Sequence, residues 1–297
     1  MGMEISGSDM NASVSTDEFI SKGIQVSIGH RAENIEGVDC LIRTAAAHND
    51  NPEIAAARAK GTTVLTNAAR EPEIEDLAGY LNRCGAHIHG AGESCIVIEG
   101  VPHLYGSTYT VMPDRIAAAT YAAALACAGG QIEIAGCDPA SYDSFLRFLA
   151  GTGVQVSRVG DCVRLARDPA VPLRGGAHLR ADAWPAFATD TAPLAAAVLL
   201  TAAGASEIYD SLFANRFACA AGFAAMGAAC TVRGRQLTLP GGAVLHGTDV
   251  TAPDLRGGAA LLAAALAADG ETRLRDPGHI PRGYENLPAA LRGLGAE

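Results

Sequence analysis

Lysine, aromatic residues and long apolar runs are scarce in this sequence. Lys22 and Lys60 are the only lysines among 297 residues, and aromatic residues make up 5% of the chain. No apolar run reaches the ~18 residues that a membrane-spanning helix requires, and no basic segment leads into an apolar stretch as in a secretory signal. The sequence therefore predicts a cytoplasmic location and no membrane partner.

Positive charge is also scarce. The chain carries 22 basic and 32 acidic residues, which gives a net charge of −10. The basic residues are scattered and form no block, so the sequence argues against a nucleic-acid partner. Almost all of them are arginine, and isolated arginines in an acidic protein are typical of sites that bind small anions.

Cysteines are present, but without the spacing of a metal site. No Cys-x-x-Cys pair occurs and no His-rich spacing accompanies the cysteines, so we predict no metal, no cofactor and no disulfide framework. We expect most of the thiols to be small, buried and reduced. The eight residues are Cys40, Cys84, Cys95, Cys127, Cys137, Cys162, Cys219 and Cys230.

Alanine-rich stretches recur along the chain at a nearly constant period. Hydrophobic residues make up 49% of the sequence, and their alanine content favours closely packed helices. A glycine ends an apolar helical pattern at residues 85, 153, 227 and 295, at spacings of 68, 74 and 68 residues. A second set of glycines leads into alternating strand patterns. A period of roughly 70 residues that contains helix, strand, helix, strand and strand is an α/β unit, too long for a solenoid repeat.

Aspartate recurs at the starts of the alanine-rich helices. Asp114, Asp190 and Asp254 each precede such a helix, at spacings of 76 and 64 residues. Aspartate is among the best N-cap residues, because its carboxylate accepts hydrogen bonds from free backbone amides and lies at the positive end of the helix dipole. We therefore expect all three to be N-caps.

The first 58 residues do not follow this period. Their pattern predicts strands at residues 3–9, 25–28 and 40–42, a short helix ending near residue 23, and a helix over residues 51–60. This alternation predicts a Rossmann-like fragment that is too short for a complete doubly wound domain.

Residues 59–297 resemble the C-terminal part of the UDP-N-acetylglucosamine 1-carboxyvinyltransferases, which are enolpyruvyl transferases of peptidoglycan synthesis. The resemblance rests on stretches in the family's order: AKGTTVLTNAAREPEI at 59–74, IVIEGV at 96–101, MPDRI at 112–116, FATD at 187–190, FANRF at 213–217, DLR at 254–256 and HIPRGYE at 279–285.

The resemblance implies an α/β fold of two inside-out barrels, each built from three βαβαββ units, with substrates between the barrels. On this basis residues 59–110 are a remnant of the first barrel. Residues 111–297 are the second barrel, with three repeats of which the last is incomplete.

Residues 4–58 resemble a different family of the same pathway, the UDP-N-acetylmuramate–alanine ligases. The matching stretches are ISGSD at 5–9, IGHRAENIEG at 28–37 and RTAAAHNDNPEI at 43–54. The glycine-rich nucleotide loop and the ATPase domain of that family have no counterpart, so ligase activity is not expected. The junction between the two resemblances falls near residues 55–60.

The transferase resemblance implies the substrates phosphoenolpyruvate and UDP-N-acetylglucosamine. It places Asp190 beside the attacking sugar hydroxyl as the candidate base, a role compatible with capping a helix. It implies that Arg256 and Arg282 bind the phosphoenolpyruvate anions, with Arg282 also catalytic. The remaining substrate-binding candidates are Arg216 and the backbone of Leu212 near the sugar, and Asp114 and Asp254 in the cleft. For the arginines, an ordinary surface salt bridge is the alternative.

Two parts of the family's catalytic machinery have no counterpart in this sequence. These are a Lys-Asn pair and a loop that carries a cysteine general acid. We therefore expect poor turnover from the chain alone. Two alternatives to an active enzyme stay open: an inactive fragment that binds UDP-sugars or anions, and a half-enzyme whose first barrel is supplied by a separately encoded partner.

Overall fold

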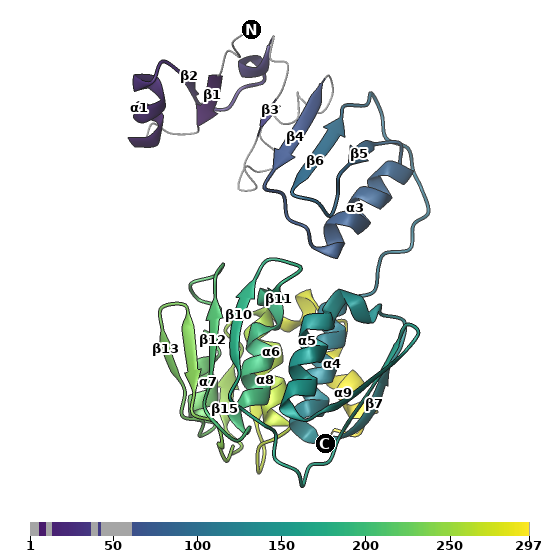
Figure 1. The fold of residues 1–297 in the computed structure, drawn as a ribbon, viewed down its shortest axis with the longest axis vertical. Coiled ribbons are helices and arrows are strands. Elements are labelled where there is room, and N and C mark those ends of the chain that lie inside the picture. The colour runs from purple at the N-terminus through teal and green to yellow at the C-terminus, as the bar shows by residue number, and fades with distance from the viewer. Residues whose placement is uncertain (1–5, 10–13, 37–40, 43–60, 297) are drawn as a thin grey trace. The chain divides into compact units, whose positions relative to one another are not determined.

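The computed structural model describes residues 6–9, 14–36, 41–42 and 61–296. The chain forms two compact units, Met1–Val111 and Met112–Glu297 (Figure 1). None of the helices in the described ranges is long and apolar enough to cross a membrane.

The first unit contains a small parallel pair of strands and a four-stranded sheet. The pair is β1-β2 and the sheet has the strand order β3-β4-β6-β5, in which β3 and β4 are parallel and the other neighbours antiparallel. The elements are β1 (Ser6–Asp9), α1 (Val14–Ser21), β2 (Gln25–Ile28), η1 (Ala32–Ile35), β3 (Leu41–Ile42), β4 (Thr62–Thr66), α3 (Pro72–Arg83), β5 (His87–His89) and β6 (Cys95–Glu99).

The strands predicted for the first 58 residues are found, and one of them pairs beyond that segment. β2 has the predicted bounds, β1 covers the described part of the strand predicted at residues 3–9, and α1 ends just before Gly23, whose φ is 82°. The helix predicted over residues 51–60 lies outside the described residues. β3 pairs with β4, so this sheet extends across the junction predicted near residues 55–60.

The second unit repeats one pattern of helices and strands. Its elements are α4 (Arg115–Ala128), β7 (Gly130–Ile134), η2 (Pro139–Tyr142), α5 (Asp143–Thr152), β8 (Gln155–Val159), β9 (Cys162–Arg167), β10 (His178–Asp182), β11 (Phe187–Ala188), η3 (Thr189–Thr191), α6 (Ala192–Leu200), β12 (Ser206–Asp210), α7 (Ala220–Ala225), β13 (Thr231–Arg233), β14 (Gln236–Leu239), β15 (Asp249–Thr251), α8 (Leu255–Ala265), β16 (Arg273–Arg275), η4 (Ile280–Arg282) and α9 (Leu287–Gly293).

The sheets confirm the repeat that the sequence predicts. The order β10-β12-β14-β13, with a parallel pair followed by antiparallel pairs, is the same as that of β3-β4-β6-β5. The sheet β7-β9-β8 and the parallel pair β15-β16 are parts of the same arrangement. The four glycines of the repeat have φ values between 95° and 103°, a conformation that favours glycine after a helix: Gly85, Gly153, Gly227 and Gly295.

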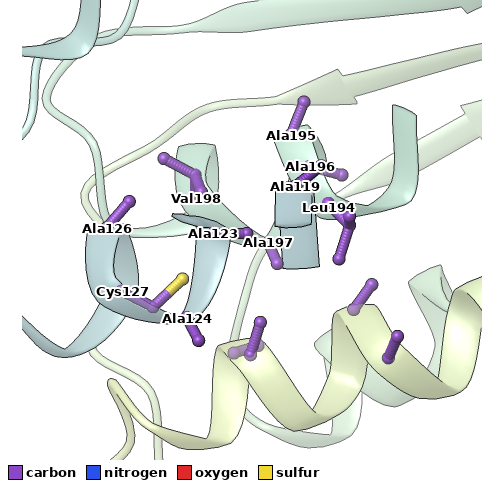
Figure 2. Close-up of a cluster of buried hydrophobic side chains, with 14 of the residues drawn as sticks. Ala119, Ala123, Ala124, Ala126, Cys127, Leu194, Ala195, Ala196, Ala197 and Val198 are labelled. Carbon is purple, nitrogen blue, oxygen red and sulfur yellow. The ribbon is translucent and has the colours of Figure 1, made fainter. Parts of the chain in front are cut away.

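Three alanine-rich helices form the centre of the second unit. α4, α6 and α8 pack against one another, and each contacts strands of its own repeat (Figures 1 and 2). All nine residues of α6 are buried, as expected for a helix that is apolar on every side. Because most side chains between the helices are alanine, the helix axes can approach closely. The helices therefore lie inside and the sheets outside, as the resemblance implied.

The described cysteines are free thiols, and four of them are buried: Cys84, Cys127, Cys137 and Cys219. Cys95 is exposed, Cys162 and Cys230 are partly buried, and Cys40 lies outside the described residues. Burial raises the pKa of the Cys127 thiol to about 12, and it also raises the pKa of the Cys219 thiol.

We predict that Ala123→Leu destabilises the second unit by about 1–3 kcal/mol, because Ala123 is 0% exposed in the helix centre and a larger side chain would force the helices apart. Ala150→Leu, at an exposed position on α5, is the control and should change the free energy of unfolding by less than about 0.5 kcal/mol. Urea denaturation measures both values. Equal losses of unfolding free energy in the two variants would contradict close packing of the central helices around Ala123.

We predict that Cys127 makes folding sensitive to alkali. Its thiol has a raised pKa in the folded state, so its contribution to stability is complete below the unfolded pKa near 9 and is lost as the pH rises toward 12. The loss amounts to about 1.4 kcal/mol per pH unit in that window. Urea denaturation at pH 8, 9 and 10 measures the free energy of unfolding. This free energy should fall less steeply with pH in Cys127→Ala than in the wild type or in the exposed control Cys95→Ala. Parallel declines would show that the thiol is not the cause.

Candidate active site

Two of the three predicted N-caps are observed at the starts of central helices. The Asp114 carboxylate accepts hydrogen bonds from the backbone of Ile116 at 2.8 Å and Ala117 at 3.1 Å, at the start of α4. Asp254 accepts a hydrogen bond from the backbone of Gly257 at 2.7 Å, at the start of α8. Both carboxylates are therefore held at the positive ends of their helices.

The third prediction, that Asp190 caps α6, is wrong. The chain enters α6 through the 3-10 turn η3, and neither η3 nor α6 has a side-chain cap. Instead, one carboxylate oxygen of Asp190 lies 3.2 Å from Nη2 of Arg216, and the other accepts a hydrogen bond from Nη2 of Arg256 at 3.0 Å. Asp190 lies within η3 and not at a cap position, and its carboxylate contacts the arginine near the start of α8.

Arg216 is held on several sides. Its side chain is 11% exposed and its guanidinium lies 4.2 Å from the ring centroid of Phe213. Its Nε donates a hydrogen bond to Oγ1 of Thr189 at 3.0 Å and lies 3.6 Å from an oxygen of Asp210. The guanidinium thus joins two carboxylates, those of Asp190 and Asp210.

Asp210, at the end of β12, is a member of the cluster that the sequence did not single out. It is 0% exposed. Its Oδ1 accepts hydrogen bonds from the backbone of Leu212 at 2.9 Å and Phe213 at 2.7 Å, and its Oδ2 accepts a short hydrogen bond from the Thr189 hydroxyl. Four bonding partners compensate for the burial of this carboxylate.

Arg256 connects the starts of the three central helices. Burial lowers the pKa of its guanidinium, but the charge and the hydrogen bond of Asp190, together with smaller contributions from Tyr284 and Asp114, raise it, and the net pKa of Arg256 is raised. Since Asp114 precedes α4, Asp190 precedes α6 and Arg256 begins α8, the same ends of the three helices converge here.

Tyr284 also belongs to this cluster, within the stretch 279–285 that carries the family resemblance. Its hydroxyl lies 2.8 Å from Oγ1 of Thr120, and both residues are buried. Burial raises the pKa of Tyr284, while Thr120 and Arg256 oppose that increase. The contact joins α4 to the segment that follows η4.

Arg282 is not part of this hydrogen-bonded cluster. It lies on η4, which packs against α8, and its exposed side chain forms no ion pair with any residue in the described ranges. The preceding loop is fixed by Asp276, whose carboxylate accepts hydrogen bonds from the backbone of Gly278, His279 and Ile280. The loop is ordered by these bonds, and the guanidinium remains available to an anion.

The remaining substrate candidate, Leu212, lies directly after the buried carboxylate of Asp210. Its side chain is exposed and its backbone amide is bonded to Asp210. An open depression of about 550 Å³ lies over the sheet β7-β9-β8, and none of the predicted site residues lines it. No group of three or more potential metal ligands occurs within the described part of the chain.

Comparisons with known proteins identify the family. A family model described as EPSP synthase (3-phosphoshikimate 1-carboxyvinyltransferase) matches residues 10–291. The UDP-N-acetylglucosamine 1-carboxyvinyltransferase of Trichlorobacter lovleyi is 42% identical over 244 residues, which cover 82% of this chain and 58% of that protein. UDP-N-acetylglucosamine 1-carboxyvinyltransferase 3 of Caldanaerobacter subterraneus is 37% identical over 285 residues, which cover 94% and 68%. The chain belongs to the EPSP synthase family of enolpyruvyl transferases.

Solved structures agree with this assignment. The enolpyruvyl transferase NikO from Streptomyces tendae has a TM-score of 0.72 and 31% identity, with 83% of this chain and 58% of that chain covered. EPSP synthase from Acinetobacter baumannii, at 16% identity and a TM-score of 0.62, shares the fold. The chain spans a little under three fifths of the length of the Trichlorobacter relative.

We predict that Asp254, which caps a helix, and Asp190, which pairs with two arginines, respond differently to substitution by asparagine. Asparagine caps helices as well as aspartate does, so Asp254→Asn should change the free energy of unfolding by less than about 0.5 kcal/mol. Asp190→Asn removes the charge between Arg216 and Arg256 and should destabilise the second unit by about 1–3 kcal/mol. Urea denaturation of both variants decides the point, and an unchanged Asp190→Asn protein would show that the ion pairs contribute nothing.

Proposed function

We propose that this chain contributes part of an enolpyruvyl transferase active site that acts on phosphoenolpyruvate and the 3-hydroxyl of UDP-N-acetylglucosamine, the first committed step of peptidoglycan synthesis. The observation that carries the proposal is the contact of Asp190 with Arg216 and Arg256 at the converging starts of the central helices. The relatives at about 40% identity are named for this reaction.

In this proposal the reaction divides among the residues as follows. Asp190 takes the proton of the sugar hydroxyl, while Arg256 and Arg282 hold the phosphate and carboxylate of phosphoenolpyruvate. Arg216 and the backbone of Leu212 contact the UDP-sugar. Asp114 and Asp254 orient the helix starts that line the substrate.

The ion pairs link anion binding to the exposure of the base. One oxygen of Asp190 accepts a hydrogen bond from Nη2 of Arg256. A phosphate or carboxylate of the substrate that pairs with this guanidinium competes with Asp190, because the substrate anion and the Asp190 carboxylate accept hydrogen bonds from the same N–H groups. The released oxygen is then available to accept the proton of the hydroxyl, so the base is freed when phosphoenolpyruvate is in place.

The domain assignment is part of the same proposal. Residues 59–110 belong to the first barrel and residues 111–297 to the second, in a cytoplasmic protein. The ligase resemblance of residues 4–58 remains a prediction. Both the family match from residue 10 onward and the pairing of β3 with β4 favour the transferase for this segment.

We predict that Arg256→Gln and Arg282→Gln each weaken the binding of inorganic phosphate by about tenfold, because each removes a charge-assisted hydrogen-bond donor. Arg292→Gln on the exposed face of α9 is the matched control and should bind phosphate as the wild type does. Isothermal titration calorimetry measures the affinities. Equal affinities in all four proteins would remove both arginines from the anion site.

Turnover and binding assays distinguish the proposed enzyme from its alternatives. The purified chain is mixed with phosphoenolpyruvate and UDP-N-acetylglucosamine, and phosphate release is followed beside binding of the UDP-sugar. Binding with turnover supports the enzyme and contradicts the expectation of poor turnover from the chain alone. Binding without turnover supports the inactive fragment or the half-enzyme that requires a partner, and absence of binding contradicts the proposal.

A further inference from the structure

Asp210 has an unusual position for an acidic residue. It is fully buried at the end of β12, and each of its two oxygens contacts different groups. Oδ1 accepts hydrogen bonds from two successive backbone amides, those of Leu212 and Phe213. Oδ2 contacts the Thr189 hydroxyl and lies 3.6 Å from Nε of Arg216. A carboxylate buried in this way is stable only while these partners stay in place.

The contacts of Oδ2 continue to Asp190. Thr189 accepts a hydrogen bond from Arg216 while its own hydroxyl donates to Asp210. The far end of the same guanidinium, Nη2, lies 3.2 Å from Asp190. Thr189 is also the residue directly before Asp190 in η3. Asp210 therefore fixes both the arginine that contacts Asp190 and the turn that carries it.

The contacts form a series of alternating charges: Asp210, Arg216, Asp190 and Arg256. At its end, Nη2 of Arg256 is bonded to the second oxygen of Asp190 at 3.0 Å, so Arg256 is linked to Asp210 only through Arg216 and Asp190. The phenyl ring of Phe213, whose backbone is bonded to Asp210, lies against the Arg216 guanidinium. One buried carboxylate thus orders a loop, a stacking ring and an ion-pair chain.

We propose that Asp210 is a positioning residue that sets the geometry of Asp190, Arg216 and Leu212 for substrate, without touching substrate itself. The role in substrate binding rests on the proposed function. The positioning of the ion pairs is independent of it.

Asparagine at position 210 separates this role from simple packing. Its carbonyl oxygen can keep the bonds to Leu212 and Phe213, but its amide nitrogen would face the N–H donor of Arg216 where an acceptor is required. Asp168→Asn is the matched control, because Asp168 also accepts a backbone hydrogen bond, from Ala170 at 2.9 Å, at an exposed loop. Thr189→Val removes only the hydroxyl that bridges Asp210 and Arg216.

The first measurement needs no ligand. NMR measures how fast each guanidinium rotates about its Nε–Cζ bond. This rotation is slower when a carboxylate holds the terminal nitrogens. We expect Asp210→Asn to accelerate rotation by about tenfold at Arg216 and by about threefold at Arg256, since charge-assisted bonds are among the stronger ones. Asp168→Asn should leave both rates unchanged. Unchanged rotation at Arg256 in Asp210→Asn would overturn the proposal, and if that variant does not fold, Thr189→Val is judged by the same criterion.

The second measurement tests the link to substrate. Calorimetry with UDP-N-acetylglucosamine should show affinity about tenfold weaker in Asp210→Asn than in the wild type and unchanged in Asp168→Asn. Equal affinity in Asp210→Asn and the wild type would contradict a role in substrate positioning. A wild-type protein that binds no UDP-sugar would refute the proposed function, while the rotation rates would still decide whether Asp210 positions the ion pairs.

Discussion

The close packing of three alanine-rich helices is the constraint on which the site depends. α4, α6 and α8 contact one another over faces made largely of alanine, so their axes approach closely and their starts converge. At that end the carboxylate of Asp190 meets the guanidinium of Arg256, from two different repeats. Larger side chains between these three helices would separate the helix starts, and the ion pair between Asp190 and Arg256 would be lost.

The three repeats place an aspartate before each central helix, but the three carboxylates have different contacts. Asp114 and Asp254 satisfy the backbone amides of their helices, whereas Asp190 contacts two arginines. The difference arises from the 3-10 turn η3, which displaces Asp190 from the cap position. The repeated unit therefore provides a helix cap in two copies and an arginine-paired carboxylate in the middle copy, which is the residue proposed as the base.

The repeat was predictable from the sequence because it depends on local signals. The glycines at 85, 153, 227 and 295 require a left-handed conformation after a helix, and their spacing revealed the period. Asp210 could not be recognised, since a carboxylate at a strand end is usually solvated and only tertiary contacts show that it is buried. The same limit applies to Asp190, for which three similar Asp-led helix starts predicted three caps. Tyr284 lay within a recognised stretch, but its contact with Thr120 spans 164 residues of sequence.

A double-mutant cycle between Asp190 and Arg256 tests the central claim most directly. The free energy of unfolding is measured for the wild type, Asp190→Asn, Arg256→Gln and the combined variant. Convergence of the helix starts predicts a coupling of about 1–3 kcal/mol between the two side chains. A coupling below about 0.3 kcal/mol would show that the two residues act independently and that the starts of α6 and α8 do not meet in this way.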